Sequence, residues 1–123
     1  MRRHSRYRQL IQDTLRDADG PLSATDVQAL LDDTGIGLAT VYRLLNEGVE
    51  DGELVGVELP GGPRRFEPAG LPHHHHFECR ACRKVFAVRG CPGRMERLVP
   101  DGFELEQHEV ILFGRCADCV TAD

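Results

Sequence analysis

Two Cys-x-x-Cys motifs constrain the second half of this 123-residue chain more than any other feature of the sequence. The first motif contains Cys79 and Cys82, and the second contains Cys116 and Cys119. Each motif can bring two thiolates to one ion, and four sulfur ligands fill a tetrahedral zinc site. The spacing therefore predicts one structural Zn²⁺ per chain, which ties the start of the second half to its last residues. Two disulfides, or two unliganded thiol pairs, are the alternatives.

The number of cysteines and the N-terminal residues bear on the compartment. Five cysteines are an odd number, and no apolar segment follows the first residues to form a signal peptide. We therefore expect a cytoplasmic protein, in which reducing conditions disfavour structural disulfides. No apolar run approaches the ~18 to 20 residues that span a bilayer, so we expect no membrane partner.

Four consecutive histidines, residues 73–76, lie just before the first cysteine motif. In an extended segment side chains alternate, so His73 and His75 should face one way and His74 and His76 the other. Because four cysteines already complete the coordination of one tetrahedral ion, the histidines can serve as ligands in two further metal sites. A purification tag is the alternative, but this run is internal. The candidate partners outside the run are Glu67, Cys91 and His108.

The charge of the chain is unevenly distributed. The net charge of −5 argues against a surface that is uniformly positive for nucleic acid. The first eight residues nevertheless contain no acid and carry four arginines: Arg2, Arg3, Arg6 and Arg8. We expect this segment to be either an arm that lies along a phosphate backbone or a solubilising tail.

Helical patterns fill most of the first half. A first helix is predicted by the helical spacing of Leu10, Ile11, Thr14 and Leu15. It should end at residues 19–21, Asp-Gly-Pro, which break a helix. A capping box of Ser23 and Asp26 should begin the second helix. The inward residues of that helix are expected to be Val27, Leu30 and Leu31.

A third helix and a hairpin complete the first half. The helix begins near Leu38, with an apolar stripe of Val41, Leu44 and Leu45. Off this stripe lie Ala39, Thr40, Tyr42 and Arg43. Residues 54–59 and 64–67 have the pattern of two strands joined by a Pro/Gly turn. Three helices followed by a hairpin predict a winged helix-turn-helix domain over residues 1–67.

The second half should form a separate domain. Residues 68–72 are rich in Pro and Gly and are expected to act as a hinge. Residues 73–123 then predict a small α/β domain, which makes the fold class α+β. Strands are expected at 85–88 and at 110–113, the second of them buried, and a short helix at 95–99. Residues 103–106 alternate in polarity just before the second strand. So small a domain has too little core without a staple, which the zinc would supply.

The motifs of the chain occur jointly in one order that is highly specific. They are Ser5-x-x-Arg8, Ser23-Ala24-Thr25-Asp26, Leu38-Ala39-Thr40-Val41-Tyr42-Arg43-x-Leu45, Gly61-Gly62-x-x-Arg65-Phe66-Glu67, the histidine run with Cys79-x-x-Cys82, and Gly114-x-Cys116-x-x-Cys119. With them the chain resembles, over nearly its whole length, the ferric-uptake-regulator (Fur) family of dimeric, metal-dependent bacterial repressors. The resemblance implies a DNA-binding domain, a dimerisation domain, a homodimer and double-stranded operator DNA, with no small organic substrate. It also implies that Tyr42 and Arg43 reach the DNA from the third helix, and we expect Ala39 and Thr40 to lie at the same DNA-binding surface.

The resemblance further implies regulatory metal sites around the hinge. One would be built from Glu67, His74 and His76, although Pro21 and Ala87 stand where many members have additional ligands. The other would be built from His73, His75, His108 and, where the family usually has Glu, Cys91. Three imidazoles and a thiolate suit Zn²⁺ better than Mn²⁺ or Fe²⁺, which favours the zinc-uptake regulators within the family. Those regulators typically also have a Cys before the histidine run and an Asp in the wing, where this chain has Glu67 and Gly56.

Two other functions are open at this stage. His76-Phe77-Glu78 with Cys116-x-x-Cys119 formally matches the ligands and proton shuttle of a zinc-dependent nucleobase deaminase, but Arg115 replaces the expected Pro. The resemblance implies a regulator and not such an enzyme. A peroxide or redox sensor of the same family would use Cys91 as a reactive thiol, with Arg89 and Arg94 nearby.

Overall fold

The structure is a computed structural model that describes residues 2–91 and 93–121, with side chains from Arg6 onward. The chain divides into two compact units, one up to Leu71 and the other from Pro72 onward. Helices and strands occur in both units, so the predicted α+β class is confirmed.

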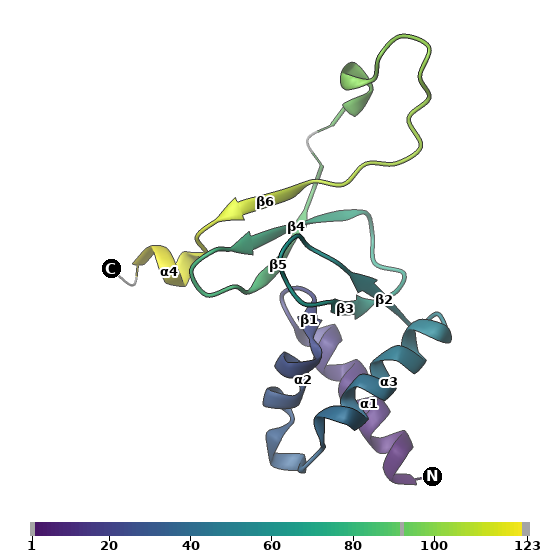
Figure 1. The fold of residues 1–123 in the computed structure, drawn as a ribbon, viewed down its shortest axis with the longest axis vertical. Helices are drawn as coiled ribbons and strands as arrows, with labels where there is room; N and C mark the ends of the chain where they lie inside the picture. Colours follow the sequence, from purple (N-terminus) through teal and green to yellow (C-terminus); the bar gives the residue numbers. More distant parts are fainter. Residues whose placement is uncertain (1, 92, 122–123) are drawn as a thin grey trace. The chain divides into compact units, whose positions relative to one another are not determined.

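Three helices form the body of the first unit (Figure 1): α1 spans Arg2–Asp17, α2 Ala24–Leu30 and α3 Leu38–Glu50. Their apolar stripes meet in one core, whose most buried members include Ile11, Val27, Val41, Leu45 and Phe66. The capping box is present, because the Asp26 N–H donates to Ser23 Oγ and the Ser23 N–H donates to the Asp26 carboxylate. The stripe predicted for the third helix is buried as expected.

Leu30 is an exception to the predicted core, since it is 61% exposed. The helix ends at this residue, and the chain continues through a 3₁₀ turn, η1, at Asp32–Thr34. Leu31 and Ile36 fill the core at this point instead. Gly35 then takes a left-handed conformation with φ of 75°, which lets the chain reverse into α3.

The sequence predicted an arm before the first helix, and this prediction is wrong for the backbone. Residues 2–8 form the first turns of α1. The Arg8 guanidinium donates to Asp51 at 2.5 Å and to Glu53 at 3.1 Å, both just beyond α3. These carboxylates raise the pKa of Arg8 through their hydrogen bonds. Arg8 therefore ties α1 to the end of α3. Arg6 is exposed, and the side chains of Arg2 and Arg3 lie outside the described part of the structure.

A three-stranded antiparallel sheet forms the wing, in the order β1-β3-β2. β2 spans Leu54–Val57 and β3 spans Arg65–Pro68, which gives the predicted hairpin with slightly shifted ends. β1 spans Leu22–Ser23 and was not predicted. Its two residues pair with Phe66 and Arg65 of β3. Gly48 of α3 lets β2 approach closely, because a Cβ there would lie 2.6 Å from Leu54 Cδ1.

The second unit contains a three-stranded sheet in the order β5-β4-β6. β4 spans His74–Cys79, β5 spans Val85–Arg89 and lies antiparallel to it, and β6 spans Ile111–Gly114 and lies parallel to it. A 3₁₀ helix, η2, covers Met95–Leu98 where a short helix was expected, and an unpredicted α4 covers Ala117–Thr121. The strand expected at 110–113 is present as β6, but the expectation that it is buried is wrong, because Leu112 and Phe113 are 45% and 43% exposed. Residues 103–106 alternate in polarity but pair with no strand in the described chain.

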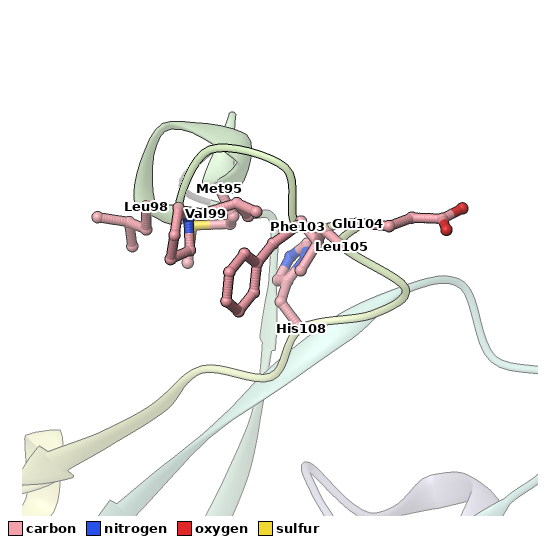
Figure 2. A pocket seen from close by; sticks show the side chains of 8 residues that line it. Met95, Leu98, Val99, Phe103, Glu104, Leu105 and His108 are labelled. Atoms are coloured by element: carbon pink, nitrogen blue, oxygen red, sulfur yellow. The ribbon is translucent and has the colours of Figure 1, made fainter.

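The second unit has little apolar core of its own. Among its described residues, the buried apolar side chains are those of Cys79 and Val85. Large apolar side chains are exposed instead, with Leu98 at 78% and Phe103 at 70% (Figure 2). A unit with so little buried apolar surface needs a covalent, metal or intermolecular staple.

Candidate metal centres

The first candidate centre consists of the four cysteines of the two motifs. Cys79 ends β4, Cys82 lies in the turn after it, and Cys116 and Cys119 lie just before and within α4. Their four sulfur atoms are all within 4.8 Å of one another. Sulfur ligands about 2.3 Å from a tetrahedral zinc ion lie about 3.8 Å apart, and the Cys82 and Cys116 sulfurs are 3.8 Å apart. The geometry therefore fits a zinc ion that joins the ends of β4 and β6.

Backbone hydrogen bonds prepare one of these thiols for metal binding. The N–H groups of Cys82 and Cys116 donate to Cys79 Sγ at 3.4 and 3.3 Å, and they lower the pKa of Cys79 to about 6. The neighbouring thiols Cys116 and Cys79 raise the pKa of Cys119 to about 12. Four sulfurs so close together cannot all ionise without a cation between them. A zinc ion would supply that charge, which is a second reason that the site fits a metal.

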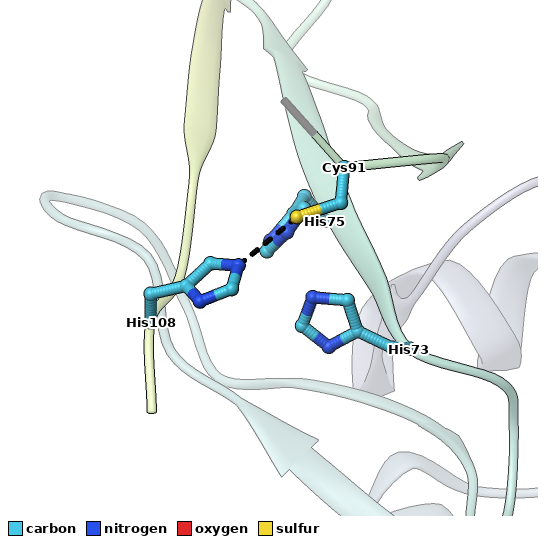
Figure 3. Close-up of side chains that lie close together, drawn as sticks. All are labelled: His73, His75, Cys91 and His108. Carbon is cyan, nitrogen blue, oxygen red and sulfur yellow. Dashed lines mark hydrogen bonds between the residues drawn. The ribbon is translucent and has the colours of Figure 1, made fainter. Parts of the chain in front are cut away.

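The second candidate centre contains three histidines and a cysteine. Figure 3 shows the side chains of His73, His75, Cys91 and His108 converging from different parts of the second unit. Their potential ligand atoms all lie within 4.8 Å of one another, and Cys91 Sγ is 3.1 Å from His108 Nε2. The ring centroids of His73 and His75 are 4.5 Å apart. Nitrogen and sulfur donors at these separations can surround one ion.

His75 is the most buried member of this set, at 3% exposure. The Val110 N–H donates to His75 Nδ1 at 3.1 Å, while His75 Nε2 is buried with no hydrogen-bond partner in the described structure. Burial, together with the nearby rings of His73 and His108, lowers the pKa of His75 and keeps the imidazole neutral. A metal at Nε2 would supply the missing partner. It would also place the ring proton on Nδ1, so the Val110 N–H would then need another acceptor.

The remaining two histidines of the run lie on the opposite face of β4, as the alternation predicts. The ring centroids of His74 and His76 are 4.9 Å apart, and His74 Nδ1 lies 2.9 Å from the Pro72 carbonyl oxygen. His76 is buried and His74 is half-buried. Glu67 belongs to the first unit, where it is a buried residue of β3. Two imidazoles on one strand face provide two of the ligands that a further ion needs.

The outer face of α3 carries the residues predicted to meet DNA. Ala39, Tyr42 and Arg43 are exposed near the start of this helix, and Thr40 is half-buried. Tyr42 is 48% exposed although it is a large aromatic residue. Arg43 lies 3.9 Å from Glu47 on the same helix and keeps most of its side chain in solvent. The face thus presents one aromatic, one cationic and one hydroxyl group at the position of a recognition helix.

Sequence reasoning missed one ion pair next to the four-cysteine centre. Glu78 is 2% exposed, and its Oε2 lies 3.1 Å from the guanidinium of Arg83. Arg83 directly follows Cys82 and has φ of 68°, the only positive φ of a non-glycine residue in the described chain. The available signal was one acidic and one basic residue five positions apart, on either side of a Cys-x-x-Cys motif. The ion pair lies across the turn that follows β4 and carries Cys82.

Comparisons with known proteins identify the family and the fold of the chain. Residues 2–113 match the ferric uptake regulator family. A ferric uptake regulation protein of Bordetella parapertussis is 36% identical over 115 residues, which cover 89% of this chain and 83% of the relative. The crystal structure of the Vibrio cholerae ferric uptake regulator superposes with a TM-score of 0.71 at 30% identity, covering 89% of this chain and 88% of that one. FurB of Mycobacterium tuberculosis, a zinc uptake regulator, has a TM-score of 0.53 at 30% identity and 95% coverage of both chains.

A winged-helix unit followed by a unit rich in thiolate and imidazole donors defines a class of metal-responsive transcriptional regulators. The chain belongs to the ferric uptake regulator family. Members of this family regulate transcription and are not enzymes. The deaminase alternative is therefore wrong, and the geometry gives the reason: Cys116 and Cys119 gather with Cys79 and Cys82 and not with His76. No helix in the described part of the chain is long and apolar enough to cross a membrane.

Proposed function

We propose that this protein is a zinc-sensing repressor of metal-uptake genes that binds operator DNA as a homodimer in the cytoplasm. The four-cysteine centre would hold a structural zinc ion. The set of His73, His75, Cys91 and His108 would hold a regulatory zinc ion that acts as corepressor. Members of the family respond to several metals, and the named relatives include ferric and zinc uptake regulators.

The donor set at the second centre is the observation that supports zinc. It offers three imidazole nitrogens and one sulfur, and it contains no carboxylate. Mn²⁺ and Mg²⁺ prefer oxygen ligands, whereas a set of four nitrogen and sulfur ligands suits Zn²⁺. Cys91 is the residue that moves the preference furthest, because thiolate is the softest donor in the set.

A second regulatory ion would link the two units. By resemblance to the family, its ligands are Glu67 from the wing and His74 and His76 from β4. An ion bound by both units would stabilise one arrangement of them, and hence one spacing between the two recognition helices of a dimer. Such coupling typically changes DNA affinity by about 5- to 150-fold.

The DNA contacts would come from α3 and from the start of α1. Ala39, Thr40, Tyr42 and Arg43 would meet base edges and backbone in the major groove, and Arg6 would contact phosphate together with Arg2 and Arg3. Arg8, the remaining arginine near the N-terminus, has a structural role instead, because its guanidinium forms ion pairs with Asp51 and Glu53. Phosphate contacts of this kind would make binding weaken with salt.

Metal stoichiometry measured together with DNA binding tests the proposal. We expect the purified protein to retain one tightly bound zinc ion per chain after mild chelation and to lose affinity for an AT-rich operator of the family type. Zinc should restore that affinity at a lower free concentration than Mn²⁺ or Fe²⁺. Restoration by Mn²⁺ or Fe²⁺ alone would assign a different metal, and DNA binding that is indifferent to metal would refute the corepressor role.

One observation favours a second function, that of a peroxide sensor. Cys91 is exposed, and its sulfur lies 3.1 Å from His108 Nε2, which can accept the thiol proton. Peroxide would then convert the thiolate to a sulfenic acid with release of hydroxide, and the site would lose a ligand. Operator release by micromolar peroxide in the zinc-loaded protein, absent from Cys91→Ser, would favour this function over zinc sensing.

A further inference from the structure

One carboxylate of the first unit lies between two guanidinium groups. Glu47 belongs to α3, and its two oxygens are near different arginines. Its Oε1 lies 3.8 Å from Nη1 of Arg8, and its Oε2 lies 3.9 Å from Nε of Arg43. Arg8 belongs to α1, whereas Arg43 lies one turn before Glu47 on α3. Glu47 is thus shared between a cation of another helix and a cation of the face predicted to meet DNA.

The two arginines are held to different degrees. The Arg8 side chain is 24% exposed, and its Nη2 lies 2.5 Å from Asp51 and 3.1 Å from Glu53. The Arg43 side chain is 60% exposed, and its separation from Glu47 is that of an ion pair without a hydrogen bond. Arg8 is therefore the fixed cation, and Arg43 is the cation that can adjust to a ligand.

The packing of α3 sets the position from which Glu47 acts. The next residue, Gly48, is buried, and a Cβ there would lie 2.6 Å from Leu54 Cδ1, so the helix lies close against β2. Side chains of a helix lean toward its N-terminus, and the Glu47 carboxylate therefore leans toward the turn that carries Arg43. Arg8 then holds the other oxygen of this carboxylate.

Stability alone gives little reason for this arrangement. Exposed ion pairs within one helix add little to stability, and the order in which the cation precedes the acid is the weaker one. Arg8 already donates hydrogen bonds to Asp51 and Glu53, so it does not need Glu47 as a counter-charge. A role for Glu47 in what Arg43 does is therefore favoured.

We propose that Glu47 is a positioning residue that orients Arg43 to read a guanine in operator DNA, while Arg8 holds Glu47 in place. This inference rests on the proposed function, which places Arg43 at the DNA. A carboxylate beside Nε leaves both Nη groups for the O6 and N7 acceptors of guanine, which a guanidinium binds in a bidentate manner. It also restrains the guanidinium from turning to a phosphate, a contact that carries no sequence information.

The test compares the affinities of the full-length protein for the AT-rich operator and for a scrambled duplex, measured by fluorescence anisotropy with whichever of Zn²⁺, Mn²⁺ and Fe²⁺ restores operator binding. Glu47→Gln should bind the scrambled duplex more tightly, because a negative charge near the phosphates is lost. The ratio of the two affinities should fall about ten-fold, since a bidentate guanine contact discriminates by about 5- to 150-fold. Glu50→Gln removes an equal charge from an exposed position of α3 and should leave this ratio unchanged.

Two further variants separate position from charge. Glu47→Asp keeps the charge, but its shorter side chain cannot reach both arginines, so it should lose discrimination as Glu47→Gln does. In Arg43→Ala discrimination should already be low, and adding Glu47→Gln should lower it no further. Operators with single guanines replaced by 7-deazaguanine, which lacks N7, should identify the base: the replacement that weakens the unmodified protein should affect Glu47→Gln much less.

Equal tightening on both duplexes in Glu47→Gln, or full discrimination in Glu47→Asp, would overturn the inference. The Glu47 side chain is 34% exposed, so the variants should fold, and an unchanged melting temperature by circular dichroism verifies this. Metal-dependent operator binding with unchanged discrimination in Glu47→Gln would keep the proposed function and refute this inference. Lost discrimination in Glu47→Gln together with metal-indifferent DNA binding would do the reverse.

Discussion

Cysteines at the two candidate centres of the second unit have different environments although they are of the same residue type. Cys79 is buried and accepts hydrogen bonds from two backbone N–H groups, which suits a thiolate that stays bound to an ion. Cys91 is exposed and lies among histidines, so it suits a site that gains and loses its ion. The environment and not the residue type decides which thiol is structural.

The pair of Glu78 and Arg83 provides a test at this scale. Arg83→Gln removes the cation from a buried carboxylate, and we expect it to lower the free energy of unfolding of the zinc-loaded protein by about 1 to 3 kcal/mol. Zinc should also pass faster to a competing chelator. Exposed Lys84→Gln, at the next position, should change neither value. An Arg83→Gln protein as stable as the unmodified one would show that the pair does not brace the turn.

The alternation in the histidine run could be predicted from sequence, because side chains in any extended segment alternate with a period of two. The residues that complete each set could not be predicted in this way. Cys91 and His108 meet through the loop geometry, and only the family resemblance pointed to them. The pairing of Glu78 with Arg83 depends on a left-handed turn at Arg83, where a non-glycine residue gives no sequence signal.

At the scale of elements, local patterns predicted the helices well and the small strands poorly. Ser23 and Asp26 cap α2 through hydrogen bonds within four residues, so the sequence contains the whole signal. β1 has two residues and exists only because Leu22 and Ser23 meet β3 more than forty positions later. Residues 103–106 show the opposite case, in which an alternating pattern finds no partner strand. A strand needs its neighbour, and a short sequence window does not contain it.

The contact between α3 and β2 gives a prediction at this scale. Gly48→Ala adds a Cβ that would lie 2.6 Å from Leu54 Cδ1, and Leu54 is only 4% exposed and cannot move into solvent. Overpacking should cost about 1 to 3 kcal/mol of unfolding free energy, which outweighs the gain of about 1 kcal/mol in helix propensity. Urea denaturation measures the difference.

A compensating substitution provides the control for this contact. Leu54→Val combined with Gly48→Ala should recover part of the loss, because the shorter side chain leaves room for the new methyl group. Gly37→Ala, where a Cβ meets nothing within 4 Å, should cost much less. A stabilised Gly48→Ala protein would show that β2 can shift away from α3 without loss.

At the scale of the whole molecule, the two units are stabilised by different means. The first has a continuous apolar core that extends from Ile11 to Phe66. The second has two buried apolar side chains in its described part and a four-thiol centre that joins the ends of its strands. Metal should therefore control the stability of one unit and leave the other nearly unchanged.

Complete chelation tests this difference. Removing the ion from the four-cysteine centre should unfold the second unit, while the helical circular dichroism of the first unit persists and melts at its original temperature. Hydrogen exchange should become fast across residues 74–79 and 111–114 but stay slow in α1 and α3. Simultaneous loss of both units would show that the first depends on the second for its stability.

The parallel pairing of β4 with β6 also has a consequence for synthesis. His76 pairs with Ile111, and two of the four thiols follow β6, so an ion at the four-cysteine centre could be enclosed only after Cys119 has left the ribosome. Until then the nascent second unit has a β4 edge without its neighbour, and such long-range pairing forms slowly. Unpaired edges of this kind promote aggregation. If that ion is zinc, as proposed, a cell short of zinc would lose newly made chains before any of them reached an operator, while repressor that was already folded kept its structural ion.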